Sequence, residues 1–258
     1  MPGVPSLIAD LIEHVPPPAF AWVGEPTAMR VATAHKGVCV FDTRFTGKSA
    51  HSSLPALGHS AVADAVRFAA FLLETGLQAS QRSTRVVGLD PPHTTFNLGQ
   101  FNGGNALNTI ACECALAWEF RPIPEDDVME LKARIRNFLC AHATGVSLPR
   151  GGESPPVGNP RPGAATHREV VYVPPLRAEG TELARAALSA LLGRDEPETV
   201  VPFGTEAGLF QLSGIAAVVC GPGSIEQAHQ PDEWIERAQL EQCAEALQRL
   251  PAHLAGRR

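Results

Sequence analysis

The sequence has 258 residues, of which 44% are hydrophobic, so it is long and apolar enough to build one large or two smaller domains with buried cores. The formal net charge is -6, and no basic cluster is longer than the terminal Arg257-Arg258. This composition argues against a disordered chain and against a nucleic-acid-binding surface. The expected partners are therefore small molecules or other protein chains.

The six cysteines form no Cys-x-x-Cys pair and lie mostly in apolar or helical patterns. This usage predicts buried thiols in a reducing compartment, with disulfides as the less favoured alternative. The amino terminus has no basic stretch followed by an apolar segment, and no apolar run approaches the roughly 20 residues that a membrane helix needs. We therefore expect a soluble, cytoplasmic protein with no signal peptide and no membrane association.

The first region of the chain ends in a loop that carries an acidic residue. Residues 6–14 have a short helical pattern, which the prolines at 16–18 interrupt. Residues 19–23 predict a strand that ends at Gly24-Glu25-Pro26. A strand thus delivers the carboxylate of Glu25 to a loop, where it is either a metal ligand or a solvated turn residue.

The central region begins with loosely alternating residues 31–44, which predict one strand. A glycine- and serine-rich turn carrying His51 follows. Residues 60–77 place apolar side chains on one face and charged side chains on the other, which predicts an amphipathic helix. Gly76 suits the C-terminal end of that helix.

Two further alternating stretches, 94–101 and 109–120, predict strands on either side of a turn. An acidic first turn then favours a helix at 127–142. A last strand at 167–173 follows the Gly- and Pro-rich segment 146–165, which we expect to be a flexible loop.

The predicted elements from residue 37 to residue 173 follow the order strand, helix, strand, strand, helix, strand, which is the ferredoxin-like order of a two-layer α+β unit. The flanking segments, 1–36 and 174–258, contain short strands and helices, the later ones at 181–192, 199–201, 215–220 and 237–250. The fold class is therefore an α/β catalytic-type domain interrupted by an inserted α+β ferredoxin-like lid domain.

The most informative loop is 221–234, which follows the apolar run 215–220. Gly221-Pro222-Gly223 breaks that buried strand, and the loop then presents His229 beside Asp232 and Glu233. An imidazole flanked by carboxylates that fix its tautomer suits a metal ligand or a general base. The alternative is a solvated loop histidine.

Seven segments, in this order along the chain, resemble the M20 family of dinuclear-zinc amidohydrolases and peptidases, and within it most closely the acetylornithine deacetylases. They are Val23-Gly-Glu-Pro-Thr27, Ala34-His-Lys-Gly37, Gly47-Lys-Ser-Ala-His-Ser-Ser-Leu-Pro55, Gly103-Gly-Asn-Ala-Leu-Asn-Thr-Ile110, Phe120-Arg-Pro-Ile-Pro124, Phe203-Gly-Thr-Glu-Ala-Gly208 and the loop 221–234.

The resemblance implies a metal centre and a reaction. Glu25 matches a carboxylate ligand of one zinc and His229 an imidazole ligand of the other, with cobalt as an alternative metal. Two such ions polarise an amide carbonyl and generate hydroxide at neutral pH. The implied reaction is hydrolysis of an N-acyl amino acid, first of all N²-acetyl-ornithine in arginine biosynthesis, with succinyl-diaminopimelate desuccinylase or another aminoacylase as alternatives.

The resemblance also assigns residues to the substrate and to a dimer. His51 matches a lid histidine that reaches into the partner's active site and stabilises the oxyanion, which implies a homodimer through the lid. Asn108 and Arg121 match lid residues that bind substrate, the guanidinium suiting an α-carboxylate. Gly204 and Thr205 match a loop that lines the same cleft. Without the resemblance, His51, Asn108 and Arg121 are ordinary polar residues of loops or strand ends.

Two motifs of the family are absent from the sequence. No His-x-Asp, whose aspartate bridges the metals, and no Glu-Glu pair, which provides the general base and a ligand, occurs in it. Glu25 and His229 alone cannot hold two zinc ions. We therefore expect a catalytic domain that is incomplete at its N-terminus and inactive alone. A second hypothesis is a non-catalytic remnant whose lid still dimerises.

Overall fold

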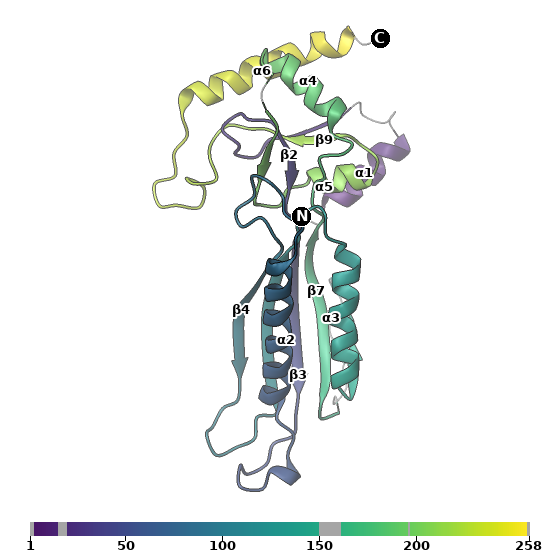
Figure 1. Cartoon of the computed structure of the whole chain (residues 1–258), viewed down its shortest axis with the longest axis vertical. Coiled ribbons are helices and arrows are strands. Elements are labelled where there is room, and N and C mark those ends of the chain that lie inside the picture. The colour runs from purple at the N-terminus through teal and green to yellow at the C-terminus, as the bar shows by residue number, and fades with distance from the viewer. Residues whose placement is uncertain (1–2, 15–19, 150–160, 196, 257–258) are drawn as a thin grey trace. The chain divides into compact units, whose positions relative to one another are not determined.

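A computed structural model describes residues 3–14, 20–149, 161–195 and 197–256 (Figure 1). It divides into two compact units. Unit 1 comprises 1–37, 86–92 and 173–258, and unit 2 comprises 38–85 and 93–172. The sequence placed the boundaries at 36/37 and 173/174, and it assigned the short segment 86–92 to the lid rather than to unit 1.

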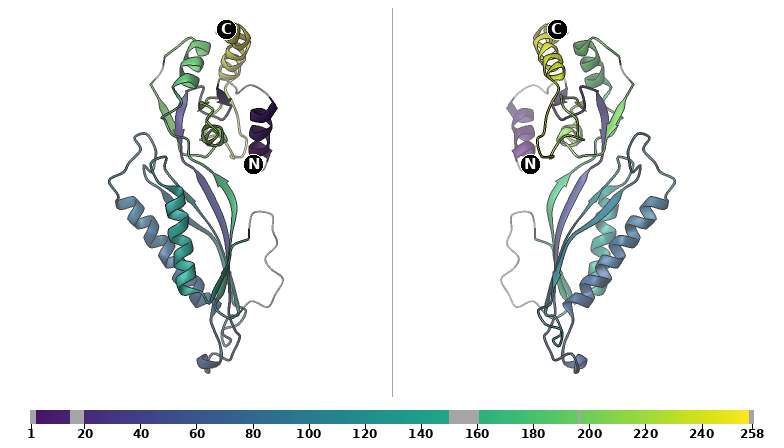
Figure 2. Two further views of the ribbon diagram at one scale, coloured as in Figure 1. Left: turned by 90° about the vertical axis from the view of Figure 1, so that its right-hand side faces the viewer. Right: turned by 90° about the vertical axis from the view of Figure 1, so that its left-hand side faces the viewer.

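Unit 2 is one sheet with two helices on a single face, as the side views in Figure 2 show. The strand order is β4-β5-β3-β7-β6, and β3 and β4 both pair antiparallel with β5. The predicted α+β ferredoxin-like class is confirmed, with β6 as an additional edge strand. The elements are β3 (Val38–Thr46), η1 (Pro55–Leu57), α2 (Ala61–Gln81), β4 (Thr95–Gly103), β5 (Glu113–Arg121), α3 (Val128–His142), β6 (Gly145–Ser147) and β7 (Ala164–Val173).

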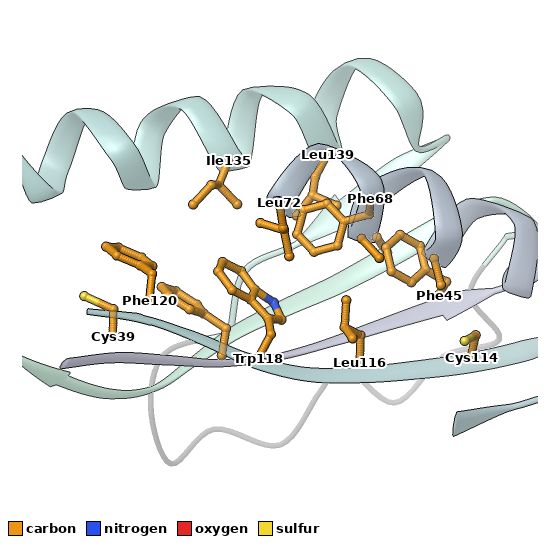
Figure 3. Close-up of a cluster of buried hydrophobic side chains, with 14 of the residues drawn as sticks. Cys39, Phe45, Phe68, Leu72, Cys114, Leu116, Trp118, Phe120, Ile135 and Leu139 are labelled. Atoms are coloured by element: carbon orange, nitrogen blue, oxygen red, sulfur yellow. The ribbon is translucent and has the colours of Figure 1, made fainter. Parts of the chain in front are cut away.

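The core of unit 2 follows from strand alternation. Every second residue of β5 points to the helix-covered face, where all four such side chains are buried. Leu72 of α2 and Ile135 and Leu139 of α3 cover them from above (Figure 3). The four residues of β5 are Cys114, Leu116, Trp118 and Phe120. Among the described residues, no helix covers the opposite face of this sheet (Figure 2).

Side-chain caps start both helices where the sequence places them. The hydroxyl of Ser60 accepts a hydrogen bond from the backbone of Ala63, and the carboxylate of Asp127 accepts two at the start of α3. The prediction that α2 ends near Gly76 was wrong, because the helix continues to Gln81. Gly76 instead allows a close approach, since a Cβ there would lie 3.3 Å from that of Phe96.

Other boundaries also differ from the prediction. The stretch 31–44 is not one strand but β2 (Ala32–His35) and β3, because the chain passes from unit 1 to unit 2 between them. Residues 109–112 precede β5 and pair with the turn that carries His51. The segment 146–165 includes most of β6 and the start of β7, and its residues 150–160 lie outside the described part.

Unit 1 contains a four-stranded sheet in the order β1-β9-β2-β8. β1 and β9 run parallel, as do β2 and β8, whereas Ala32 of β2 pairs antiparallel with Val219 of β9. Its remaining elements are α1 (Gly3–His14), β1 (Ala21–Val23), α4 (Glu182–Leu192), β8 (Thr199–Val201), α5 (Ala207–Leu212), β9 (Ala217–Val219) and α6 (Arg237–Ala255). Helix α6 extends beyond the predicted 237–250 and includes Pro251.

Both faces of this sheet are covered. Val218 and Cys220 contribute to a cluster with Ala184 and Leu188 of α4, while Ala217 and Val219 pack in a second cluster with Ala207 of α5. Adjacent residues of β9 point to opposite faces, so one short apolar strand serves two cores. The predicted α/β class of this unit is confirmed.

All six cysteines are free thiols. Cys39, Cys114 and Cys220 are buried, and burial raises the pKa of the Cys39 thiol to about 12. Cys112 and Cys140 are exposed, contrary to the expectation of buried thiols throughout. Among the described residues, no helix is both long and apolar enough to cross a membrane.

Candidate functional site

Hydrogen bonds connect the loop that follows β1 to the loop that follows β9. Because the two strands run parallel, their C-terminal ends meet at one edge of the sheet. The carbonyl oxygen of Gly221 accepts hydrogen bonds from the backbone N–H groups of Thr27 and Met29, at 3.1 and 2.9 Å. A Cβ on Gly221 would lie 2.6 Å from the carbonyl oxygen of Glu25, so only glycine fits here. The chain thus places the Glu25 loop against the start of the loop that carries His229.

His229 lies farther along that second loop and is exposed. Its φ of 63° and that of Asp232, 59°, fall in the left-handed region, which histidine and aspartate enter at a cost. The carboxylate of Glu233 accepts a hydrogen bond from the backbone N–H of His229 at 3.1 Å. The flanking carboxylate therefore stabilises the strained turn through its backbone, whereas the sequence had assigned it to the imidazole.

Glu25 is half-buried in an environment that disfavours its charge. Burial is the larger cause that raises the pKa of this carboxyl, and the negative charge of Glu206 is the second. Glu206 is the N-cap residue of α5 and directly follows the predicted substrate loop. A divalent cation would reverse this balance, because it stabilises the ionised carboxylate.

The donors on this chain do not complete a metal site. Glu25 and His229 have the oxygen and nitrogen donors that zinc accepts, but a catalytic zinc takes about three protein ligands. Across residues 3–14, 20–149, 161–195 and 197–256, no group of three or more His, Cys, Asp or Glu side chains is arranged to hold a metal ion. We therefore derive no catalytic step through a metal from these residues.

Thr205, in the predicted substrate loop, is fully buried. Its hydroxyl lies 3.1 Å from Nε2 of His35 and accepts a hydrogen bond from the backbone N–H of Ala207, also at 3.1 Å. Gly204, next to it, is half-buried. The Thr205 side chain is thus used to hold the loop and the start of α5, and Gly204 precedes it in the same loop.

In unit 2, His51 and Asn108 lie on two loops that pair with each other. His51 forms a β-bridge with Thr109, and the backbone N–H of Ser52 donates to the carbonyl oxygen of Asn108 at 2.9 Å. Both His51 and Asn108 are exposed. A Cβ on Gly47 would lie 2.2 Å from the carbonyl oxygen of His59, so the turn depends on a glycine at its start.

The hydrogen bonds of His51 assign its tautomer. Nδ1 accepts the backbone N–H of Ser53 at 3.2 Å and lies 2.7 Å from the Ser53 hydroxyl. Since a backbone N–H only donates, Nδ1 carries no proton in the neutral ring, and the proton is on Nε2. Because the His51 residue is exposed, its Nε2–H is available to donate to another group.

Arg121 lies at the opposite end of the lid sheet. Both arms of its guanidinium donate to Glu119, from Nε at 3.1 Å and from Nη2 at 2.9 Å. The two residues are on the uncovered face of β5. A substrate carboxylate at this position therefore has to join or displace Glu119.

The length of β5 separates these lid residues. Arg121 is its last residue, whereas the His51 and Asn108 loops meet the sheet before its first residue, Glu113. At about 3.4 Å per residue, the nine-residue strand spans roughly 27 Å. Arg121 therefore cannot share one small-molecule site with His51 and Asn108 of the same unit.

A cavity of about 780 Å³ in unit 2 lies at the same end of the sheet as the His51 and Asn108 loops, but neither of those two residues lines it. It lies at the end of the sheet where β3 and β4 finish and β5 begins, and its polar lining includes Arg44, Asn102, Glu113 and Thr166. None of the seven predicted site residues lines it. We therefore do not assign it to the candidate site.

Sequence reasoning missed three residues that act on the predicted ones. Glu206 lies inside a motif that was recognised, and Glu119 precedes Arg121 by two, the spacing that puts two side chains on one face of a strand. Glu206 and Glu119 could therefore have been identified from the sequence. The His35–Thr205 contact joins residues 170 apart, and no local pattern predicts it.

The chain is thus an α/β unit interrupted by a ferredoxin-like unit, and the loop that carries Glu25 meets the start of the loop that carries His229 at one edge of the α/β sheet. Residues 33–145 match the family model of the M20 peptidase dimerisation domain. The recognition of an M20-type chain from its sequence motifs is therefore confirmed.

Similar curated proteins are longer than this chain. An acetylornithine deacetylase from Myxococcus xanthus is 36% identical over 248 residues, which cover 92% of this chain and 58% of that protein. One from Yersinia pestis is 33% identical, with 92% and 56% covered. An N-acetyl-L-citrulline deacetylase from Xanthomonas campestris is 32% identical, with 95% and 62% covered. The chain thus spans a little over half the length of the curated relatives it matches.

Solved structures support the fold. A tripeptidase from Staphylococcus aureus has a TM-score of 0.64 at 18% identity, covering 93% of this chain and 58% of that one. Aminopeptidase PepT from Bacillus cereus has a TM-score of 0.60 at 19% identity, covering 89% and 55%. At these identities the likeness extends to the fold alone.

Proposed function

We propose that this chain is part of a metal-dependent hydrolase that cleaves the amide bond of N-acyl amino acids, with N²-acetyl-ornithine as the first substrate and arginine biosynthesis as the setting. The observation that carries the proposal is the parallel pairing of β1 and β9, which joins a carboxylate loop to an imidazole loop in a chain similar to acetylornithine deacetylases. The names of those relatives support the substrate class.

The proposed cofactor is zinc, two ions in the complete site, with cobalt as an alternative. Glu25 and His229 would each provide one ligand. The His-x-Asp and Glu-Glu motifs that the family resemblance requires do not occur in these 258 residues. We therefore propose that hydrolysis requires a polypeptide segment that supplies those ligands and the general base, because Glu25 and His229 cannot replace them.

The lid residues have distinct proposed roles. The Nε2–H of His51 would donate to the oxygen of the scissile carbonyl as negative charge develops on it, which is the work of an oxyanion-hole donor. Arg121 would bind the α-carboxylate, and Asn108 would add a polar contact beside His51. Gly204 and Thr205 would shape the cleft through the backbone of their loop.

The separation along β5 supports a homodimer. If His51 acts on a substrate that Arg121 binds, the two must come from different copies of the lid, because roughly 27 Å separates them in one copy. Helix α2 also has a second apolar stripe that faces away from its own core, with intervals of four, three and four residues. Its exposed residues are Val66, Ala70, Leu73 and Leu77.

Strand β4 adds to that surface. It is one of the two edge strands of the sheet, most of its residues are exposed, and Gly76 of α2 packs closely on its Phe96. The apolar stripe and an unpaired strand edge therefore adjoin, and a second copy would cover both at once. We propose that this surface of one lid packs against the same surface of a second copy of the chain.

The test of the proposed function is steady-state hydrolysis by a preparation that includes the missing metal ligands. We expect N²-acetyl-ornithine to be hydrolysed, and His229→Ala to lower kcat/KM by at least about a hundredfold. His14→Ala, which alters an exposed histidine of α1, is the matched control. Full activity of the His229 variant would contradict the assignment.

The same assay separates the alternative substrates. N-acetyl-citrulline and N-succinyl-diaminopimelate present the same amide bond with different side chains or acyl groups. The kcat/KM ratios among the three acyl amino acids identify the preferred one, since a single polar contact discriminates by tenfold or more. A desuccinylase would favour the succinyl compound.

A second candidate function is a non-catalytic dimerisation module. The observation that favours it is that unit 2 has a continuous core of its own between its sheet and two helices. The intact mass of the native polypeptide distinguishes the two functions. A mass near 27.4 kDa favours a module or a split enzyme, whereas a heavier chain favours a hydrolase with all its ligands in one polypeptide.

We also propose a cytoplasmic location. The six free thiols support it, because exposed thiols such as Cys112 and Cys140 persist in a reducing compartment. Fractionation of cells followed by detection of the native protein tests this proposal.

A further inference from the structure

Three segments of unit 1 meet at His35. This residue ends β2, immediately before the chain passes to unit 2. Its backbone pairs with Leu176, just after the chain returns, through two hydrogen bonds of 3.2 Å. Its side chain meets Thr205 in the loop 202–206, which leads into α5.

The side chain of His35 lies inside a hydrogen-bond chain with one consistent direction. Nδ1 is 2.8 Å from the carbonyl oxygen of Lys36, which only accepts, so Nδ1 carries the proton. Nε2 of the neutral ring then accepts the hydroxyl proton of Thr205 at 3.1 Å. The Thr205 oxygen in turn accepts the backbone N–H of Ala207. Each donor has an acceptor, and each acceptor has a donor.

Burial keeps this imidazole neutral. His35 is completely buried, and burial lowers the pKa of its ring to about 4. Protonation of Nε2 would remove the atom that accepts the hydroxyl proton of Thr205, so this hydrogen bond would be lost. The neutral Nδ1–H form is therefore the one that fits both neighbours.

The segment that contains Thr205 is also held by close packing, at the start of α5. A Cβ on Gly208 of α5 would lie 2.3 Å from the carbonyl oxygen of Pro174 and 3.0 Å from that of Pro175. The first turn of α5 thus rests on the return crossing, beside the Leu176 that pairs with His35. These contacts hold the end of the loop 202–206 and the start of α5 against the return crossing.

From these contacts we propose that His35 is a positioning residue, whose Nδ1–H imidazole holds Thr205 and thereby fixes the loop 202–206 relative to both chain crossings. The inference rests on the proposed function, which makes this loop part of the substrate cleft. His35 touches no substrate. It acts through Thr205 and through the start of α5.

Two variants of His35 separate positioning from simple filling of space. In His35→Gln, the amide oxygen reaches the place of Nε2 and still accepts from Thr205. In His35→Asn, the shorter amide reaches only the place of Nδ1, keeps the bond to Lys36 and loses Thr205. Thr205→Ser and Thr205→Val form the matching pair, one with a hydroxyl and one without.

The measurement is hydrogen exchange of the Ala207 amide in the purified chain. We expect roughly two- to tenfold faster exchange in His35→Asn and Thr205→Val, and little change in His35→Gln and Thr205→Ser. The double variant His35→Asn with Thr205→Val should exchange no faster than either single one, because both break the same chain. Equal exchange in the Asn and Gln variants, or additive effects, would overturn the inference.

Imidazole nitrogen NMR shifts of the unaltered chain give a second, independent readout. We expect a protonated Nδ1 and a bare Nε2 at pH 7, and the opposite tautomer would overturn the inference. Neither measurement uses substrate. Loss of the exchange pattern with hydrolysis retained therefore rejects the positioning role alone, and absence of hydrolysis with the pattern retained rejects the proposed function alone.

Discussion

At the scale of single residues, Arg121 shows how a neighbour determines what a functional group offers. Its two donating arms are already satisfied by Glu119, so the guanidinium is held in one orientation and partly neutralised. A substrate carboxylate would bind most strongly if the same two N–H groups of the guanidinium donated to its two oxygens. Lysine, a point charge, cannot reproduce it.

We therefore expect Arg121→Lys to raise the KM for N²-acetyl-ornithine about tenfold or more, with a smaller change in kcat, in a preparation competent for hydrolysis. Arg44→Lys is the control, since Arg44 also donates to a carboxylate, Asp42, on the same sheet face. An unchanged KM in the Arg121 variant would remove this residue from the site.

His167 makes a different prediction, about pH. Its buried ring stacks on Phe41 and meets the Thr43 hydroxyl at 2.9 Å, and burial lowers its pKa from 6.5 to about 4. The unfolded chain therefore binds a proton that the folded chain does not between these two values. The stabilisation that this neutral ring contributes to the folded state is fully present above pH 6.5 and is lost as the pH falls toward 4.

The expected loss is about 3 kcal/mol for this one group, from roughly 1.4 kcal/mol per unit of pKa difference. Chemical denaturation followed by tryptophan fluorescence, to which the buried Trp118 of the lid core contributes, measures it at a series of pH values. His167→Phe should lower stability at pH 7, because Thr43 loses its acceptor, but should flatten the slope between pH 4 and 6.5. An unchanged slope in this variant would show that other groups cause the acid sensitivity.

At the scale of elements, α5 illustrates a helix whose sequence is set by what it packs on. Gly208 lies within α5, although a glycine in a helix interior normally lowers helix stability by about 1 kcal/mol relative to alanine. Here a Cβ would collide with the backbone of Pro174. We expect Gly208→Ala to destabilise unit 1 by about 1–3 kcal/mol, as overpacking does, measured by denaturant unfolding.

Gly145→Ala is the control for that substitution, since nothing lies within 4 Å of the added carbon. A stabilising Gly208→Ala would mean that the return crossing yields to the helix. In that case the close contact between α5 and the crossing, on which the rigidity of loop 202–206 depends, would be weaker than the structure indicates.

The elements also show what the sequence could predict. Alternation and capping residues gave the lid strands and helices, since those signals are local. The break between β2 and β3 was missed because the loose alternation of residues 31–44 was interpreted as one strand, whereas the chain passes from unit 1 to unit 2 within it. The second apolar stripe of α2 was missed because the charged residues Arg67 and Glu74 directly follow Val66 and Leu73 in the sequence, so one face was assigned to the core and the other to solvent.

The candidate site divides in the same way. Glu25 and His229 were singled out as candidates because strand ends and loop breaks are visible in sequence. The contacts that hold the site residues were not all found, since His35 and Thr205 are distant in the chain. The burial of the Thr205 hydroxyl likewise depends on packing between segments.

At the scale of the whole molecule, the prediction concerns association. We expect the chain to be a dimer, near twice 27.4 kDa by light scattering. Val66→Asp with Leu73→Asp should make it monomeric, because two charges would be buried in an apolar interface. Val87→Asp, at an exposed apolar residue of unit 1, is the control. A monomer before any substitution would contradict the homodimer.

The nine residues of β5 have a consequence for how such chains vary in length. A strand alternates its faces, so inserting one residue would turn every following side chain from the core to the open face. Two residues, matched in β3 and β4, would preserve the faces and add about 7 Å between Arg121 and the His51 loop. Natural lids of different reach should therefore differ by even numbers of residues in this strand, and an engineered pair would lengthen the span without unfolding the lid.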